Sequence, residues 1–218
     1  LNGMASYPMD NRFPHLSSKT SGLADWLAMD ARTPADLVNN AIYIYMMEVT
    51  AIMADAVGRT DICRMLNERH DKAKQEWNEC YVDEATGMTK AADGTLVHSQ
   101  SSYATPINFN CFSDKNIKRA EQWLAVLAEH PSQSGNGGMS FSDYTITTGF
   151  SGTPNILPAL SRTGHWDEAY RMFCCTDFTS WLYPVSHGAT SIWERWNGYE
   201  CAFGKHQENT MNSFNHFA

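Results

Sequence analysis

The stretch Val38–Val57, VNNAIYIYMMEVTAIMADAV, gives the strongest helix signal in this chain of 218 residues. Its apolar side chains recur at a spacing of four and form one wide face: Ala41, Ile42, Tyr45, Met46, Val49, Ile52 and Met53. This periodicity predicts an amphipathic helix. Pro34 comes just before it, Asp36 is its expected cap, and Gly58 is its expected end.

The next residues predict a partner for this helix. Thr60 is expected to cap a second helix that runs from Asp61 to about Val82. The short link makes the two segments a helical hairpin, and the residues 83–88, DEATGM, predict a turn after it. A hairpin of this kind must bury its apolar faces against neighbouring elements.

More helical segments follow, with loops between them. A third candidate covers Ser99–Phe112, which Pro106 interrupts, and Ser113 is expected to cap a fourth whose residues Ile117, Trp123, Leu124, Leu127 and Ala128 share one face. Thr153–Ser161 and Asp167–Cys174 predict another hairpin, and Gly188 precedes a predicted helical stretch through Trp196. Loops are expected at 135–144 and 176–187, and the end, NTMNSFNHFA, resembles the first turns of a helix.

The fold class expected from this layout is all-α. Alternating residues near 140–148 are too few to predict a strand pair, and a repeat of fixed length, which would indicate a solenoid, is not visible. A ring of paired helices, the (α/α)6 barrel or helical toroid, fits better. Four to five hairpins are too few to close six, so residues 1–218 are expected to be an incomplete domain that lacks its N-terminal hairpins and its final helix.

The composition excludes several classes of partner. The formal net charge is −8 and the sequence pI is about 5.4, without a run of Lys or Arg, so a nucleic-acid partner is not expected. No unbroken apolar run approaches eighteen residues, and no leader sequence is visible, so no membrane span is expected. The six cysteines match no zinc spacing and are interpreted as unpaired thiols, which favours a cytoplasmic location.

The densest group of reactive and aromatic side chains is the segment 180–199, SWLYPVSHGATSIWERWNGY. Glu194 lies there between Trp193 and Arg195, with Trp196 next. Indole faces stack on the C–H faces of sugars, so a carboxylate among them is a candidate for glycoside chemistry. The alternative is a Glu on a solvated helix face, paired with Arg195 or Lys205.

Weaker candidates lie elsewhere in the chain. Asp25 and Trp26, in GLADWLA, stand at a loop-to-helix junction, and His216 lies in FNHFA. Each of these has a structural alternative, since a lone His or Trp among aromatic residues is more often part of a packed core. His187, Asp143 and Asp177 also lie beside aromatic residues and carry the same alternative. A phosphate-binding loop, a metal cluster or a nucleophile elbow is not recognisable in the sequence.

Five segments, in the right order, resemble glycoside hydrolase family 78, the α-L-rhamnosidases. GATSIWERWNG at 188–198 resembles the family's GATTIWERWDG, and GLADWLA resembles its GDWLA, with Ala24 in place of Gly. The residues 147–172, TTGFSGTPNILPALSRTGHWDEAYRM, resemble its TGFVGTP…LPALSEAG…AYRLL. SWLYPV at 180–185 and SFNHFA at 213–218 resemble its SWGYMV and SLNHYAFG. The resemblance covers nearly the whole chain.

The resemblance implies an (α/α)6 barrel that hydrolyses terminal α-L-rhamnose with inversion and needs no metal or cofactor. It makes Glu194 the general base and makes Trp26 and His216 contacts of the sugar, with Asp25 and Trp193 beside them as substrate-binding candidates. The departures Ser191 for Thr and Asn197 for Asp do not affect the base. The family's general acid lies in a segment like DCPQRDERLGWTGD, upstream of GDW, which this chain lacks; the 218 residues alone are therefore expected to be inactive.

Two alternative functions stay open from the sequence. One is a different (α/α)6 enzyme, either another glycosidase or a polysaccharide lyase, although a lyase for uronates would need a cationic groove that an acidic chain does not favour. The other is a non-catalytic sugar-binding module that has kept the ring and lost the acid. The expected partner is a rhamnose-containing oligosaccharide or glycoside, and assembly into a homo-oligomer is open.

Overall fold

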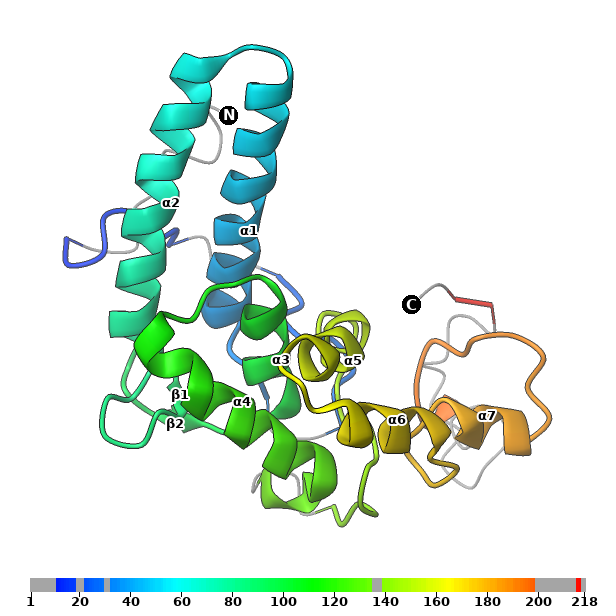
Figure 1. Cartoon of the computed structure of the whole chain (residues 1–218). Helices are drawn as coiled ribbons and strands as arrows, with labels where there is room; N and C mark the ends of the chain where they lie inside the picture. Colours follow the sequence, from blue (N-terminus) through cyan, green and yellow to red (C-terminus); the bar gives the residue numbers. More distant parts are fainter. Residues whose placement is uncertain (1–10, 19–21, 30–31, 135–138, 199–214, 217–218) are drawn as a thin grey trace.

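The computed structural model describes residues 11–18, 22–29, 32–134, 139–198 and 215–216. It is mainly helical, as expected from the sequence (Figure 1). The helices are α1 (Ala35–Ala56), α2 (Thr60–Tyr81), α3 (Gln100–Asn108), α4 (Asp114–Glu129), α5 (Thr153–Arg162), α6 (Trp166–Cys174) and α7 (Leu182–Ser186), with a 3₁₀ turn at Pro131–Ser134. Two short strands, β1 (Thr89–Lys90) and β2 (Leu96–Val97), pair antiparallel with Thr89 opposite Val97.

Helix α1 begins three residues earlier than the sequence predicted, because Pro34 occupies the N-cap position. Asp36 lies inside the first turn and forms no cap hydrogen bond, so its predicted capping role is wrong. Gly58 follows the helix with φ of +73°, and the Arg59 amide closes the turn on the Ala54 carbonyl at 2.8 Å. A left-handed glycine at this place is the usual end of a helix.

The buried face of α1 differs from the face predicted. The residues that pack into the core are Leu37, Val38, Asn40, Ala41, Tyr43, Ile44, Met47, Ala51 and Ala54. Tyr45, Met46, Ile52 and Met53 are exposed, and Ile52 and Met53 are each 64% exposed. Because α1 is apolar on nearly every side, the spacing of its residues predicted the helix but could not identify the face that packs.

The apolar character of α1 also bears on membranes. In length and composition it could cross a bilayer, with a mean hydropathy of 1.3 over its most apolar window. The expectation of no membrane span considered only unbroken runs of apolar residues. The mean hydropathy of a window also counts runs that a few polar residues interrupt, and for α1 it reaches 1.3. Half of the window is buried inside the fold, and the core helix of a globular protein passes the same test.

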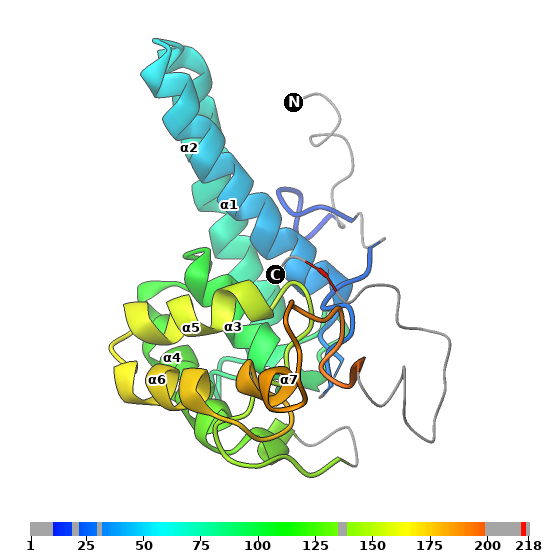
Figure 2. The same cartoon turned by 90° about the vertical axis from the view of Figure 1, so that its right-hand side faces the viewer.

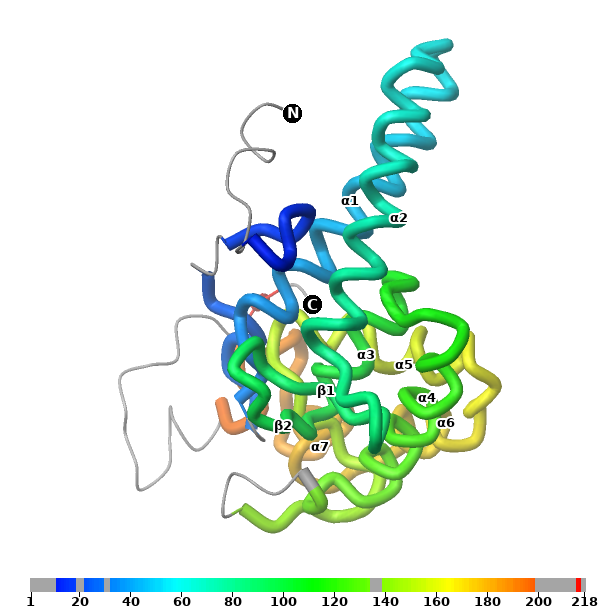
Figure 3. Tube along the Cα trace, turned by 90° about the vertical axis from the view of Figure 1, so that its left-hand side faces the viewer, coloured from blue at the N-terminus to red at the C-terminus, as the bar shows by residue number. Residues whose placement is uncertain are grey.

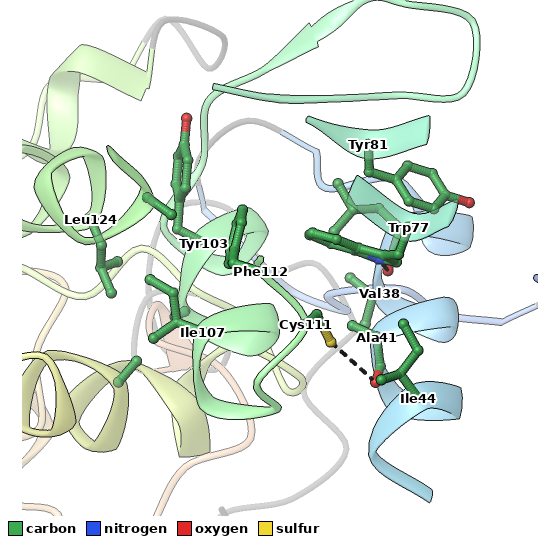
Figure 4. Close-up of a cluster of buried hydrophobic side chains, with 14 of the residues drawn as sticks. Val38, Ala41, Ile44, Trp77, Tyr81, Tyr103, Ile107, Cys111, Phe112 and Leu124 are labelled. Carbon is green, nitrogen blue, oxygen red and sulfur yellow. Dashed lines mark hydrogen bonds between the residues drawn. The ribbon is translucent and has the colours of Figure 1, made fainter. Parts of the chain in front are cut away.

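Helix α2 packs along α1, and at the end of the hairpin opposite its turn Trp77 and Tyr81 contact the first turns of α1 (Figure 4). The Trp77 indole is fully buried, donates to the Leu37 carbonyl at 3.3 Å and meets the Phe112 ring edge to face at 5.1 Å. Asn40, itself buried in α1, donates to the Tyr81 hydroxyl at 3.1 Å. Helix α2 begins at Thr60 itself, so the cap predicted there is the first residue of the helix.

Helix α3 lies at the centre of the body and is buried from Gln100 to Ile107. A capping box starts it: the Ser99 side chain accepts from the Ser102 amide, and the Ser102 side chain accepts from the Ser99 amide. Pro106 lies within the helix, so the predicted interruption did not end it. A buried helix with a polar sequence needs partners for its side chains, and these come from loops that build the site described below.

The six longer helices form three successive hairpins that are arranged as an arc. α1 contacts α3 and α3 contacts α5, which makes an inner row, while α4 and α6 contact each other outside it. Figure 2 shows α3 to α6 stacked in two layers with the α1–α2 hairpin projecting from them, and Figure 3 shows β1 and β2 at the base of α2. Such a two-layered arc is the arrangement of consecutive hairpins in a partial helical toroid.

Three local predictions are corrected by the structure. The region 176–187, predicted as a loop, contains helix α7. The residues 189–196, predicted to be helical, have an irregular backbone with bends and a turn. The strands β1 and β2 were not predicted, because two residues each carry too short an alternation to be recognised. Most of the predicted terminal helix, 209–214 and 217–218, and Cys201 and Lys205 lie outside the described residues.

Candidate functional site

The segment 189–197, which carries Glu194, is held in place by contacts at both ends. Trp196 donates its indole N–H to the Thr148 carbonyl at 2.7 Å and packs edge to face on Trp181 at 5.2 Å. The His216 amide donates to the Ile192 carbonyl at 2.9 Å. The second bond occupies the Ile192 carbonyl, which a helix would use itself, and Thr, Ser, Ile and Trp are weak helix formers, so the segment stays irregular.

A second turn, at 24–28, presents Trp26. The backbone is left-handed at Ala24 (φ +52°) and at Leu27 (φ +66°), and the Ala28 amide donates to the Asp25 carbonyl at 3.1 Å. The Trp26 side chain is 45% exposed, although large aromatic residues are usually buried. Positive φ at residues other than glycine is uncommon and is a reason to examine a segment for function.

Two adjoining cavities open between these segments. The inner cavity has an empty volume of about 410 Å³ and the outer cavity about 790 Å³. Trp26, Phe150 and Glu194 line both of them. The inner cavity is otherwise lined by Leu27, Thr148, Gly149, Thr153, Trp181, Ile192, Trp193, Arg195 and Trp196, and the outer one by Leu23, Ala24, Ser151 and His216.

The structure therefore brings together four of the five residues singled out in the sequence. Glu194, Trp26 and His216 meet at the outer cavity, and Trp193 joins Glu194 and Trp26 at the inner one. The His216 ring packs on Phe150 with the ring centroids 4.9 Å apart. The wall is rich in indole, and its charged side chains within the described lining are Glu194 and Arg195. A partly solvated carboxylate facing aromatic rings can accept a proton from water beside an apolar ligand.

Asp25 is the fifth residue, and it does not line either cavity. Its side chain is buried behind Trp26, and its carboxylate accepts hydrogen bonds from Ser101, Ser151 and the backbone amides of Gly149 and Gly152. The structure thus places Asp25 under the aromatic wall rather than in contact with the space that a ligand would occupy.

The remaining candidates lie away from these cavities. Asp143 is exposed and pairs with the ring of His130 at 3.0 Å, and the side-chain hydrogen bond raises the pKa of His130. The exposed His187 has its Nδ1 2.9 Å from the Tyr183 carbonyl oxygen, and Asp177 is exposed. In the part of the chain that the structure describes, no group of three His, Cys, Asp or Glu side chains could hold a metal ion.

Several lining residues escaped the sequence interpretation. Phe150 lies in TTGFSG, where the two glycines were noticed only as part of a longer resemblance. Trp181 lies thirteen residues before Glu194, and the aromatic content of that segment was the signal that could have placed it in the site, as it did for Trp196. Leu27 and Thr148 carry no such signal, since their role depends on a turn that the sequence does not reveal.

Known proteins resemble this chain over nearly all of its length. A family model described as the bacterial α-L-rhamnosidase six-hairpin glycosidase domain matches residues 4–218. An α-L-rhamnosidase of Streptomyces avermitilis is 32% identical over 198 residues, which is 90% of this chain and 17% of that protein. One from Formosa agariphila is 28% identical over 208 residues, 92% of this chain and 20% of that protein. The chain thus spans at most a fifth of the length of these relatives.

Solved structures show the same likeness. The crystal structure of the S. avermitilis α-L-rhamnosidase in complex with L-rhamnose superposes with a TM-score of 0.75 at 31% identity, covering 93% of this chain and 18% of that one. The native α-L-rhamnosidase of Aspergillus terreus superposes with a TM-score of 0.77 at 24% identity, covering 96% of this chain and 23% of that one. The second likeness bears on the fold alone.

Proposed function

The chain belongs to the bacterial α-L-rhamnosidase six-hairpin glycosidase family, and on that premise we propose that it is part of the catalytic domain of an enzyme that hydrolyses terminal α-L-rhamnose from glycosides. The family resemblance seen in the sequence is confirmed by the match to residues 4–218. The observation that carries the proposed activity is the meeting of Glu194, Trp26 and His216, far apart in sequence, at one cavity.

In this proposal Glu194 is the general base of an inverting reaction. Inverting glycosidases place two carboxyl groups about 6.5–9.5 Å apart, so that a water molecule fits between one of them and the anomeric carbon. Glu194 takes a proton from that water as the oxygen attacks, and the glycosidic oxygen leaves with a proton from the second group. Glu194 lines both cavities, so a water molecule can reach its carboxylate from either.

The aromatic wall supplies the surface on which the sugar rests. Trp26 and Trp193 offer indole faces to the C–H face of the ring and to the C6 methyl group, which distinguishes rhamnose from hexoses with a 6-hydroxyl group. The His216 imidazole, which packs on Phe150, would hydrogen-bond a ring hydroxyl in this proposal. Apolar faces bind an apolar side of the ligand without leaving polar groups unpaired.

The general acid comes, in this proposal, from a part of the enzyme other than the described lining of the two cavities. Glu194 is the one carboxylate within that described lining. The matched part makes up only 17% and 20% of the length of the two relatives, so a full-length enzyme of this kind has further residues from which an acid can come. The 218 residues alone should therefore not turn over an α-L-rhamnoside.

The test uses the full-length enzyme that contains this chain, with an aryl α-L-rhamnoside as substrate. Glu194→Gln should lower kcat by roughly 10²–10⁴-fold, the usual contribution of a general base, because the amide cannot accept the proton from water. Binding of L-rhamnose should remain. Glu84→Gln is the matched control, since Glu84 is exposed and pairs with Lys115 on the outer surface, and it should keep wild-type rates.

The stereochemistry gives an independent check. The wild-type enzyme should release β-L-rhamnose first, which NMR detects before mutarotation. A kcat for Glu194→Gln within tenfold of wild type, or initial release of the α anomer, would refute the role of Glu194. A full-length protein that binds L-rhamnose but never hydrolyses the substrate would instead indicate the non-catalytic sugar-binding module.

A further inference from the structure

Asp25 carries a buried carboxylate that the proposed reaction does not use. Its side chain is in contact with four donors, two on each oxygen. Oδ1 accepts from the Gly152 amide at 2.8 Å and from the Ser151 hydroxyl at 3.1 Å. Oδ2 accepts from the Gly149 amide at 2.9 Å and from the Ser101 hydroxyl. A residue that is only 7% exposed and fully engaged in this way acts on its surroundings rather than on a ligand.

The two turns that Asp25 joins are the ones that carry the aromatic wall. Phe150 donates its amide to the Trp26 carbonyl at 2.9 Å, and the single Ser151 hydroxyl proton is shared between Asp25 Oδ1 and the Ala24 carbonyl, whose oxygen lies 2.8 Å from the hydroxyl. The contact is so close that a Cβ added at Gly149 would overlap the Trp26 carbonyl oxygen. Trp26 and Phe150 both line the two cavities with Glu194.

We infer that Asp25 is a positioning residue: its carboxylate fastens the turn at 24–28 to the turn at 149–152 and so fixes Trp26 and Phe150 against the cavity that holds Glu194. The inference rests on the proposed function, because it assigns this junction to sugar binding. It reassigns Asp25 from a contact of the sugar to a support for the residues that touch it.

The pattern of donors explains why a carboxylate is needed. Each oxygen of Asp25 receives one backbone amide, from Gly149 or from Gly152, and a backbone amide can only donate. Asparagine has one oxygen, so either orientation of its side chain would set its NH₂ group against one of these amides. The buried amide would be left unsatisfied, which is costly in a site closed to water. The turns would separate to relieve the clash.

Glu194 is joined to this junction less directly than Trp26, which follows Asp25 in the chain. Its segment is tied to the Thr148 carbonyl through Trp196, and that carbonyl belongs to the same peptide group as the Gly149 amide that binds Asp25; the Ile192 carbonyl of the segment is also held by the His216 amide. Loss of the Asp25 carboxylate should therefore weaken the hold on the sugar more than the activation of water. KM and the Kd of L-rhamnose are expected to rise, while kcat changes much less.

The experiment compares Asp25→Asn with wild type in the full-length enzyme. The Kd of L-rhamnose and KM should each rise at least tenfold, and kcat should fall less than threefold. Asp143→Asn is the matched control, because it removes a carboxylate from an exposed loop that does not line the cavities. Both constants should stay within twofold of wild type in that control.

A second readout needs no ligand. Hydroxyl-radical footprinting by mass spectrometry should show Trp26 oxidised at least twice as fast in Asp25→Asn, with the exposed Trp166 of α6 as the internal reference. If Asp25→Asn does not fold, Ser101→Ala removes a single donor and should shift both readouts in the same direction, by less.

The outcomes separate the two proposals. The inference is overturned if Asp25→Asn folds and its Trp26 is oxidised at the wild-type rate. It is also overturned if the wild-type enzyme binds L-rhamnose and the folded variant binds it with the same Kd. A wild-type enzyme that neither binds L-rhamnose nor hydrolyses rhamnosides refutes the proposed function. In that case the oxidation rate of Trp26 by itself still tests whether Asp25 holds the turn in place.

Discussion

Ala24 is one of the two residues of the Trp26 turn, with Leu27, whose backbone is left-handed although they carry a side chain. Its φ is +52°, in the left-handed region that costs an L-residue with a Cβ about 1–2 kcal/mol. In the family motif that GLADWLA resembles, glycine stands at this place. The Ala24 carbonyl accepts from Ser151, so the turn keeps its conformation despite the strain.

Ala24→Gly should raise the free energy of unfolding by about 0.5–1 kcal/mol. Removal of the Cβ relieves the strain, and the greater freedom of glycine in the unfolded chain offsets part of the gain. Urea denaturation can be followed by pulsed alkylation of the buried Cys111 thiol, which reports on this domain within a longer protein. Ala125→Gly, in the middle of α4, is the control and should lower stability by about 1 kcal/mol. A lower midpoint for Ala24→Gly would contradict the strain.

The sequence indicated the residues that line the candidate site better than the residues that hold them in place. Glu194, Trp26 and His216 could be grouped because their motifs resemble those of one family, not because of their spacing. The hydrogen bonds of Asp25 could not be predicted, since its partners Gly149 and Gly152 lie more than 120 residues away. A motif indicates which residues matter and does not distinguish a residue that touches the ligand from one that supports it.

At the level of elements, α3 combines burial with a polar sequence. Gln100 shows how this is possible. Its side-chain NH₂ group donates to the Leu127 and Thr145 carbonyls, each at 2.9 Å, and its side-chain oxygen accepts from the Thr147 amide at 2.9 Å. One side chain therefore joins α3 to the end of α4 and to the loop that leads to Gly149.

Gln100→Leu should destabilise the domain by at least about 2 kcal/mol. The substitution keeps the volume roughly the same but leaves two carbonyls and one amide buried without their partner, and each such group costs about 1–3 kcal/mol. The same pulsed alkylation of Cys111 measures the loss. Gln75→Leu is the control, because Gln75 lies on the exposed side of α2, where substitutions usually change stability by less than about 0.5 kcal/mol. Equal midpoints for the two variants would show that this network contributes little.

The elements themselves were predictable to different degrees. The helices α1, α2, α4, α5 and α6 follow from apolar spacing and from their flanking Pro, Ser and Gly residues. The packed face of α1 did not follow, because nearly every side of that helix is apolar. The helix predicted before Trp196 is absent, because two hydrogen bonds with residues distant in the sequence hold this segment in another conformation. The Trp196 indole donates to the Thr148 carbonyl, and the His216 amide donates to the Ile192 carbonyl.

For the whole molecule, the core contains ionisable groups that burial keeps neutral. Burial raises the pKa of the Cys80 thiol to about 11, and it also raises the pKa of Cys111 and of the hydroxyls of Tyr81 and Tyr103. The sequence interpretation of Cys80 and Cys111 as unpaired thiols agrees with the structure, in which both are free.

The stability of the domain should fall as the pH rises above about 9. Below that value the thiols are protonated in both states, and the raised pKa has its full stabilising effect. Above it the unfolded chain loses protons that the folded chain retains, so unfolding becomes easier until the pH passes the folded value, about 11 for Cys80. Urea midpoints read by hydrogen exchange of the domain at pH 7.5, 9 and 10 test this.

Cys111→Ala should reduce the slope of that decline, whereas Cys174→Ala, at an exposed position of α6, should not change it. A urea midpoint that stays the same at pH 7.5, 9 and 10 would contradict the effect of burial on these thiols.

The hydrogen bond between Asp25 and Gly149 joins residues 124 positions apart, and this separation determines the order in which parts of the fold can form during synthesis. At about 5–20 residues per second, a ribosome needs roughly 6–25 s to make the partner after Asp25 has been added. The α1–α2 hairpin, with contacts between neighbours in sequence, can form during that interval. The Trp26 turn must wait for residues 149–152, so a nascent chain can form its first hairpin well before this turn is held in place.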